Sequence, residues 1–303
     1  MSKRSLFLAC FSLVAVPAAF LSAAEQGPTT LSNSTLSTFD SPTATFFAIG
    51  LKPQLAATRQ ACDVLVLIDT SASQTGLFRD DSITALKTMV KGLGADDRVQ
   101  LLAVDVTSVE LTDTFVAPSS PQMVSALSLL DQRTPLGSTD LHEALLTAVQ
   151  AFEKAASPRT QAVVYIGDGM SKANLFADKE FAEIVKKLVH AHIPVSSYAI
   201  GPQRDIALLA TLANHTGGML YIDADGEHSA QQAGLAMVDV VHTPIAWPTE
   251  AHFGDGLRDT LPATLPPLRA DRETVVIGKL KRGADHSVAV DATVNGQPVR
   301  LEW

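Results

Sequence analysis

Two short runs of apolar residues, each ending at an aspartate, constrain the fold of this chain most strongly. Residues 64–68 read Val-Leu-Val-Leu-Ile and precede Asp69, and residues 162–166 read Ala-Val-Val-Tyr-Ile and precede Gly167-Asp168. Uninterrupted apolar runs of this length, rich in β-branched residues, are typical of strands buried on both faces of a parallel sheet. Because ligands gather at the carboxyl ends of such strands, both aspartates are candidate site residues.

The segments around these runs alternate between strand and helix patterns. The strand-like residues 98–105 and 109–116 are joined by a connection too short for a crossover helix, so the second strand should run antiparallel at an edge. The sequence therefore predicts a doubly wound α/β fold with a mostly parallel sheet, one antiparallel edge strand and a small β-rich C-terminal module. Further strands are predicted at 194–200 and 219–222, and helices at 81–93, 121–131, 140–154, 178–190, 205–214 and 229–241.

Polar oxygen atoms follow both apolar runs. If the chain stays extended beyond Asp69, then Asp69, Ser71 and Ser73 point to one side, because side chains alternate along a strand. Thr139 and Asp168 could complete the group. Hydroxyl and carboxylate oxygens suit a hard cation such as Mg²⁺, and the set contains no Cys or His of the kind that zinc and copper prefer.

Each motif also has a purely structural interpretation. Asp and Ser are common in turns and at helix N-caps, and Gly167-Asp168-Gly169 by itself signals a turn. Asp140 and Glu143 have the spacing of a capping-box variant, so Asp140 is assigned to the start of a helix and not to the metal set. The joint occurrence of three motifs at strand or helix boundaries is what favours a metal site.

The three motifs, in this order, resemble the von Willebrand factor type A domain with its metal-ion-dependent adhesion site. The resemblance covers residues 61–243 and extends along residues 137–145. Gly167 departs from the family pattern, in which Thr or Ser often precedes this Asp, and it removes a hydroxyl from beside the site. The resemblance implies a divalent cation, Mg²⁺ or alternatively Mn²⁺ or Ca²⁺, with Ser71, Ser73 and Thr139 as ligands and with Asp69 and Asp168 bound directly or through water.

The resemblance also implies a function in protein binding. A cation left short of one ligand would accept an Asp or Glu carboxylate from a protein partner. Two rivals stay open: a metal-assisted hydrolase, which would need a general base that none of the three motifs supplies, and a scaffold in which the metal only stabilises the fold. The leading expectation is an adhesion module that is not an enzyme.

The N-terminal residues predict export. Met1 to Ala24 combines Lys3 and Arg4, an apolar stretch and small residues at the expected cleavage point, which together describe a secretory signal peptide. The stretch is short for a membrane anchor and contains Pro17, and no later segment reads as transmembrane. The mature protein is expected to be secreted, periplasmic or on the cell surface, without a stable membrane span.

The regions on either side of 61–243 are expected to be simpler. Residues 25–60 read as a Ser/Thr-rich linker, flexible over 26–45, with one strand at 43–51. Residues 244–303 read as an irregular Pro-rich stretch followed by three strands, which the strand at 43–51 is expected to join in a β-module. These strands are predicted at 273–280, 286–294 and 299–303, with a hairpin turn at Asn295-Gly296. The sequence ends within an apparent strand, so it is expected to be the front part of a longer protein.

The charge of the chain argues against nucleic-acid binding. Removing the signal peptide takes Lys3 and Arg4 from the 23 basic residues and nothing from the 32 acidic ones, which leaves a net charge of −11. An acidic chain without a basic stripe is a poor nucleic-acid binder. Cys62, the cysteine outside the signal peptide, is expected to be either a small buried hydrophobe or half of an intermolecular disulfide.

Overall fold

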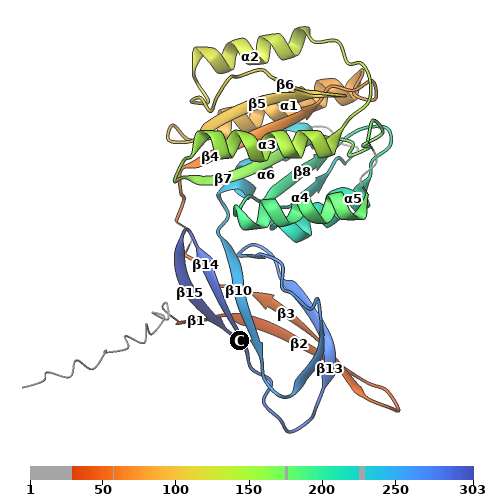
Figure 1. The fold of residues 1–303 in the computed structure, drawn as a ribbon, viewed down its shortest axis with the longest axis vertical. Helices are drawn as coiled ribbons and strands as arrows, with labels where there is room; N and C mark the ends of the chain where they lie inside the picture. The colour runs from red at the N-terminus through yellow and green to blue at the C-terminus, as the bar shows by residue number, and fades with distance from the viewer. Residues whose placement is uncertain (1–28, 57, 175–176, 225–228) are drawn as a thin grey trace, which may run out of the picture.

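An α/β domain and a β-sandwich make up the part of the chain that the computed structural model describes, residues 29–56, 58–174, 177–224 and 229–303 (Figure 1). The expected signal peptide lies outside the described residues. Among the described helices, none combines the length and the apolar character needed to cross a bilayer.

The α/β domain is built on a six-stranded sheet in the order β6-β5-β4-β7-β8-β9. All neighbours in it are parallel except β6, which pairs antiparallel with β5 at the edge, so the predicted fold class is confirmed. The strands are β4 (Cys62–Asp69), β5 (Arg98–Val104), β6 (Ser108–Glu110), β7 (Thr160–Gly167), β8 (Val195–Ala199) and β9 (Leu220–Ile222).

The edge strand β6 is shorter than the predicted 109–116. The backbone N–H of Leu101 donates to the hydroxyl of Thr112 instead of to a backbone carbonyl, which interrupts the ladder. Pairing returns only as an isolated bridge between Val99 and Val116. A side-chain hydrogen bond of this kind competes with regular pairing and is not visible in an apolar pattern.

Alternating side chains of the central strand β4 enter two different cores. Val64, Val66 and Ile68 pack in one core, and Leu65 and Leu67 pack in the other, which explains the continuous apolar run. The first core is shared with α1 (Leu77–Gly92), α2 (Pro121–Gln132) and α6 (Ser229–His242), and the second with α3 (Leu141–Ala155), α4 (Asp178–His190) and α5 (Ile206–Thr216).

Cys62 belongs to the first of these cores. Its side chain is fully buried, and burial raises the pKa of its thiol to about 12. A buried, protonated thiol is a weak nucleophile, so the structure favours the small buried hydrophobe over the intermolecular disulfide.

The β-sandwich, called the β-module below, combines strands from both flanks of the α/β domain. One sheet has the order β1-β15-β14-β10-β12 and the other the order β11-β13-β3-β2, and their facing side chains share one core. The strands are β1 (Thr29–Leu31), β2 (Asn33–Asp40), β3 (Thr45–Lys52), β10 (Ile245–Phe253), β11 (Leu257–Leu261), β12 (Leu268–Arg269), β13 (Thr274–Leu280), β14 (Val288–Val294) and β15 (Gln297–Glu302).

Two predictions for the flanks are wrong. The segment 26–45 was expected to be a flexible linker, yet from residue 29 onward it contains β1 and β2. Its Ser and Thr side chains are exposed on β2, an edge strand, and exposed edge strands and linkers share this composition. The Pro-rich stretch contains β10, β11 and β12, and β10 accommodates Pro248 beside a register shift, where prolines are tolerated.

The strands expected at 43–51, 273–280, 286–294 and 299–303 are present with shifted ends as β3, β13, β14 and β15. β3 pairs with β13 along its whole length. Asn295 and Gly296 both have positive φ, 50° and 75°, as the predicted two-residue hairpin turn requires.

Arg269 joins the β-module to the α/β domain. Its side chain is fully buried, and its Nη1 donates to the carbonyl of Gly217, the residue that caps α5 (2.9 Å). Its Nη2 donates to the carbonyl of Val240 near the end of α6 (3.4 Å), and Asp271 accepts two further bonds at 2.8 and 2.7 Å. Carbonyls at helix C-termini lack helical donors and carry partial negative charge, so a buried guanidinium is well matched to them.

Replacing Arg269 by Ala should strongly destabilise the protein. The change removes a buried side chain that donates to the carbonyl of Gly217, to the carbonyl of Val240 and to Asp271, and each buried acceptor left without a partner costs about 1 to 3 kcal/mol, so the free energy of unfolding should fall by about 3 kcal/mol. Urea unfolding of wild type and variant measures it. Arg282→Ala is the control, because the Arg282–Asp40 ion pair is exposed and should contribute little. Equal effects of the two changes would contradict this role for Arg269.

Candidate functional site

The predicted site residues lie at the carboxyl edge of the parallel sheet. Asp69 is the last residue of β4, and Asp168 directly follows β7. The two strands are neighbours, with Ile68 opposite Ile166, so the aspartates leave the sheet at the same edge. The loop that carries Thr139 precedes α3 and reaches the same place.

The first motif reaches the site by a turn and not by extended chain, so that expectation is wrong. The backbone N–H of Ser71 donates to Asp69 Oδ1 (2.8 Å), and the N–H of Gln74 donates to the carbonyl of Ser71 (3.0 Å). An aspartate that accepts from the backbone two residues later is a common way to start a turn. The turn still brings the two hydroxyls together, with Ser71 Oγ and Ser73 Oγ 3.0 Å apart.

Thr139 is held against the first motif. Its hydroxyl donates to Asp69 Oδ2 (2.9 Å). Backbone bonds fix the two loops together, from Ala72 N to Gly137 O (3.1 Å) and from Leu136 N to Thr70 O (3.0 Å). Asp140 accepts from the N–H of Glu143 (2.9 Å) and caps α3, as the sequence predicted.

Asp168 is fixed by the loops that follow β7 and β8. Its Oδ1 accepts from the N–H of Met170 (2.9 Å), and its carbonyl accepts from the N–H of Asp205 (2.8 Å). The backbone of Gly201 passes so close that an added Cβ would lie 2.7 Å from the Cβ of Asp168. The position of this carboxylate is therefore set by packing on two sides.

Both carboxylates are almost completely buried. Asp69 and Asp168 are each 2% exposed, Thr139 and Ser71 are buried, and Ser73 is half-buried. Burial raises the pKa of Asp69, and the negative charge of Asp168 raises it further. Hydrogen bonds link Asp69, Ser71, Ser73 and Thr139, and Asp168 lies at the same edge. Oxygen groups of this kind suit a hard divalent cation, whose charge would offset the repulsion between the two carboxylates.

Tyr165 is the residue of this site that the sequence analysis missed. It is fully buried on β7, and its hydroxyl donates to Asp69 Oδ2 (2.9 Å). The hydroxyl oxygen of Tyr165 in turn accepts a hydrogen bond from the N–H of Gly169 (3.1 Å). Burial, followed by the charges of Asp69 and Asp168, holds the pKa of Tyr165 well above its usual value, so the hydroxyl keeps its proton. Tyr165 thus connects the Asp69 carboxylate to the loop that carries Asp168.

Tyr165 and Asp69 fill the space beside Gly167. Residues 165 and 167 share one face of β7, because side chains alternate along a strand. A Cβ at position 167 would lie 2.4 Å from the Cβ of Asp69 and 2.5 Å from the Tyr165 hydroxyl oxygen. The tyrosine hydroxyl therefore occupies the space that a Thr or Ser at 167 would need, and the hydroxyl expected to be missing is supplied from Tyr165. A hydroxyl-bearing residue two positions before a glycine was the available sequence signal.

Comparison with known proteins gives a consistent result. A family model of the von Willebrand factor type A domain matches residues 62–222. The chain is similar to inter-alpha-trypsin inhibitor heavy chain H2 of Sus scrofa, 23% identical over 224 residues, and to heavy chain H6 of Homo sapiens, 24% identical over 234 residues. These alignments cover 72% and 73% of this chain but 24% and 18% of the relatives, so the chain spans about a quarter of their length or less.

Solved structures share the fold at lower identity. A von Willebrand factor type A protein from Catenulispora acidiphila has a TM-score of 0.60 at 13% identity, and the alignment covers 93% of this chain and 75% of the other chain. The human COPII-coat protein Sec24c has a TM-score of 0.56 at 16% identity, and the alignment covers 80% of this chain and 43% of the Sec24c chain. Because the family model matches more than half of its residues, this chain belongs to the von Willebrand factor type A domain family.

Proposed function

We propose that this protein is an exported, divalent-cation-dependent protein-binding module without enzymatic activity. The cation, Mg²⁺ or alternatively Mn²⁺ or Ca²⁺, is held by the hydroxyls of Ser71, Ser73 and Thr139, and the carboxylates of Asp69 and Asp168 bind it directly or through water. The observation that carries the proposal is the hydrogen-bonded group of oxygen donors around Asp69 at the carboxyl edge of the sheet.

The coordination chemistry supports a carboxylate from a partner as the remaining ligand. Mg²⁺ demands about six oxygen ligands and is seldom enclosed by protein alone, so positions stay open for water or an outside group. The chain has a formal net charge of −9, which repels an acidic partner. Attraction of a carboxylate must therefore come from the cation, and binding should depend fully on it.

The family supports a protein as the partner, since von Willebrand factor type A domains usually mediate protein interactions. A hydrolase would need a general base within reach of a metal-bound water. The hydrogen bonds described around Asp69 and Asp168 use hydroxyls and backbone N–H groups, which serve as donors to these carboxylates. Because these hydroxyls and N–H groups are not general bases, we propose binding and not turnover.

Magnesium should stabilise the protein reversibly. A ligand bound only by the native state raises the free energy of unfolding by about 2.7 kcal/mol at a hundredfold excess over Kd. Thermal unfolding with Mg²⁺, and again after chelation, measures the rise in Tm. Asp69→Asn should erase the rise, whereas Asp113→Asn, at an exposed aspartate, should keep it. If calorimetry detects no binding of a divalent cation to the folded wild type at millimolar concentration, the proposed site is wrong.

Tyr165→Phe should weaken magnesium binding without removing a ligand. The change deletes the hydroxyl that orients Asp69, and loss of such a supporting partner typically costs about 10- to 100-fold in metal affinity. Tyr198→Phe is a matched control, because Tyr198 is also fully buried but its hydroxyl donates to Asp223, outside the site. Calorimetric Kd values for both variants decide the point. Unchanged affinity in Tyr165→Phe would show that its hydroxyl only stabilises the fold.

Thr139→Ala should separate binding from folding. The substitution removes one of three donors to the buried Asp69 carboxylate, so the free energy of unfolding should fall by about 1.5 to 3 kcal/mol with the fold retained, while capture of the partner should be lost almost completely. Wild type and variant, each immobilised with Mg²⁺ or with chelator, are compared for retention of proteins from the organism's own secreted and surface fraction. Thr211→Ala, at an exposed threonine of α5, is the control.

Equal retention in all these conditions would show that the partner is not bound at the carboxyl edge of the sheet that carries Asp69 and Thr139. It would favour the scaffold alternative, with contacts made by the β-module. One outer sheet face of that module exposes large apolar side chains of neighbouring strands, which gives this outcome a physical basis: Phe39, Phe46, Leu261 and Ile277.

A further inference from the structure

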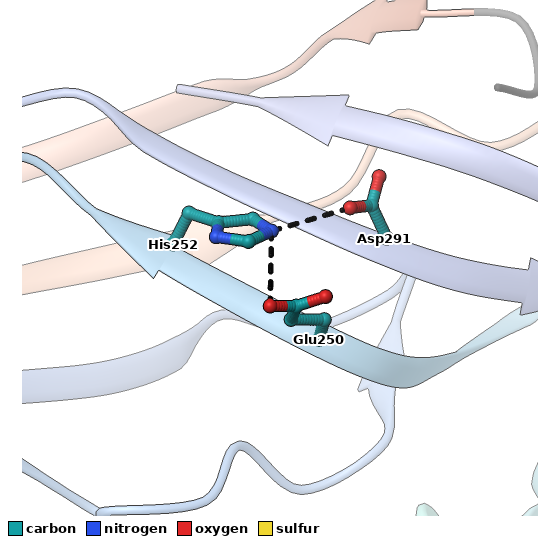
Figure 2. A group of neighbouring side chains, drawn as sticks. All are labelled: Glu250, His252 and Asp291. Carbon is teal, nitrogen blue, oxygen red and sulfur yellow. Dashed lines mark ion pairs between the residues drawn. The ribbon is translucent and has the colours of Figure 1, made fainter. Parts of the chain in front are cut away.

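A second group of metal-ligating side chains lies in the β-module. Glu250 and His252 project from β10, and Asp291 projects from the neighbouring β14 toward them (Figure 2). His252 Nε2 lies 3.4 Å from Asp291 Oδ2 and 3.7 Å from Glu250 Oε1. The three ligand atoms all lie within 4.8 Å of one another, and the side chains are partly open to solvent.

A register shift in the sheet creates this group. Residues 250 and 252 share one face of β10. Before the shift Pro248 is opposite Ala292, and a regular ladder would then place Asp291 opposite Thr249, on the other face. The shift between Pro248 and Glu250 places Asp291 opposite Glu250 instead, on the face that carries His252. Bulges that re-aim a side chain in this way are common at functional sites.

Two of the three separations in the group fit a tetrahedral ion. Zinc holds nitrogen and oxygen ligands at about 2.0 to 2.1 Å, so two ligands of a tetrahedral site lie about 3.3 Å apart. The 3.4 and 3.7 Å separations around His252 are close to this value without any movement of the backbone. One imidazole and two carboxylates are zinc donors, in contrast to the all-oxygen group around Asp69.

The charges of the group also match a divalent cation. With a neutral imidazole, Glu250 and Asp291 supply two negative charges. Arg300 Nη1 donates to both oxygens of Asp291, at 2.9 and 3.0 Å, and fixes the orientation of that carboxylate. Carboxylate ligands of metals are usually held by such outer hydrogen bonds, and the charge of Arg300 is itself balanced by Glu302, whose Oε1 accepts from Arg300 Nε at 3.0 Å.

We propose that Glu250, His252 and Asp291 form a zinc site that is separate from the magnesium site, with a fourth position open to solvent. Three protein ligands and an open fourth position allow water or a group from a partner to complete the tetrahedron. The site depends on the β-module alone, so it stands or falls independently of the proposed adhesion function.

Zinc titration of the full chain in excess Mg²⁺ tests the proposal. Calorimetry should show one equivalent of Zn²⁺ bound to the wild type. His252→Ala and Glu250→Gln should each weaken binding by at least about tenfold, because each removes a direct ligand and loss of an outer partner alone costs that much. His190→Ala removes an exposed histidine of α4 and should leave zinc binding unchanged.

One further variant keeps the two proposals apart. Asp69→Asn should retain zinc binding while it loses the magnesium effect. Absence of zinc binding in the wild type, or wild-type affinity in both His252→Ala and Glu250→Gln with unchanged circular dichroism, would overturn the zinc site and leave the magnesium site untouched. Loss of zinc binding in Asp69→Asn would also overturn it, because the ion would then belong to the first site.

Discussion

A single buried carboxylate, that of Asp69, organises the functional edge of the α/β domain. A carboxylate removed from water must be compensated by hydrogen bonds or by a cation. Here the compensation comes from three directions, the backbone of Ser71, the hydroxyl of Thr139 and the hydroxyl of Tyr165. Each donor belongs to a different segment, so the loops after β4, before α3 and around the end of β7 are fixed relative to one another by their common acceptor. These bonds hold the oxygens of this edge together.

The β-module leaves that edge free. Arg269 and Arg272 reach carbonyls of Gly217, Gly218 and Val240, which belong to the end of α5 and the last turn of α6. Helices in this fold run opposite to the strands they cover, so these carbonyls lie near the amino ends of the strands. In agreement, Thr160 at the start of β7 and Trp247 of β10 line one hollow at the junction. The two candidate ion sites therefore lie in different units. A large partner could bind at the carboxyl edge of the parallel sheet without contacting the β-module.

Much of the α/β domain could be predicted because its signals are local. A continuous apolar run reports burial on both faces, and the loop motifs follow it directly in the chain, so β4, β7 and the residues around Asp69 were accessible from the sequence. Tyr165 was not, because a tyrosine inside an apolar run reads as core, and only the close approach of Gly167 to Asp69 gives its hydroxyl a role. The same holds for Asp291, whose face is decided by a shift of one residue in the register of β10. Edge strands such as β2 are hidden for another reason, since solvent-exposed Ser and Thr look alike in a strand and in a linker.

The β-module is built from strands on both sides of the α/β domain in the chain, as when β1 pairs with β15 and Thr29 lies opposite Arg300. This order of strands affects how the module folds during translation. During translation β2 and β3 emerge early, but their partner β13 is made only after the entire α/β domain. Closing such long loops is entropically costly, and contacts between distant residues form slowly. The buried apolar side chains of β3, Phe47 and Ile49, therefore lack most of the core that covers them while the α/β domain is completed, because its other strands come later in the chain. In the growing chain the β-module becomes protected only after the α/β domain is complete, and exposed strands of this kind are where a nascent protein is most open to chaperones, proteases and self-association.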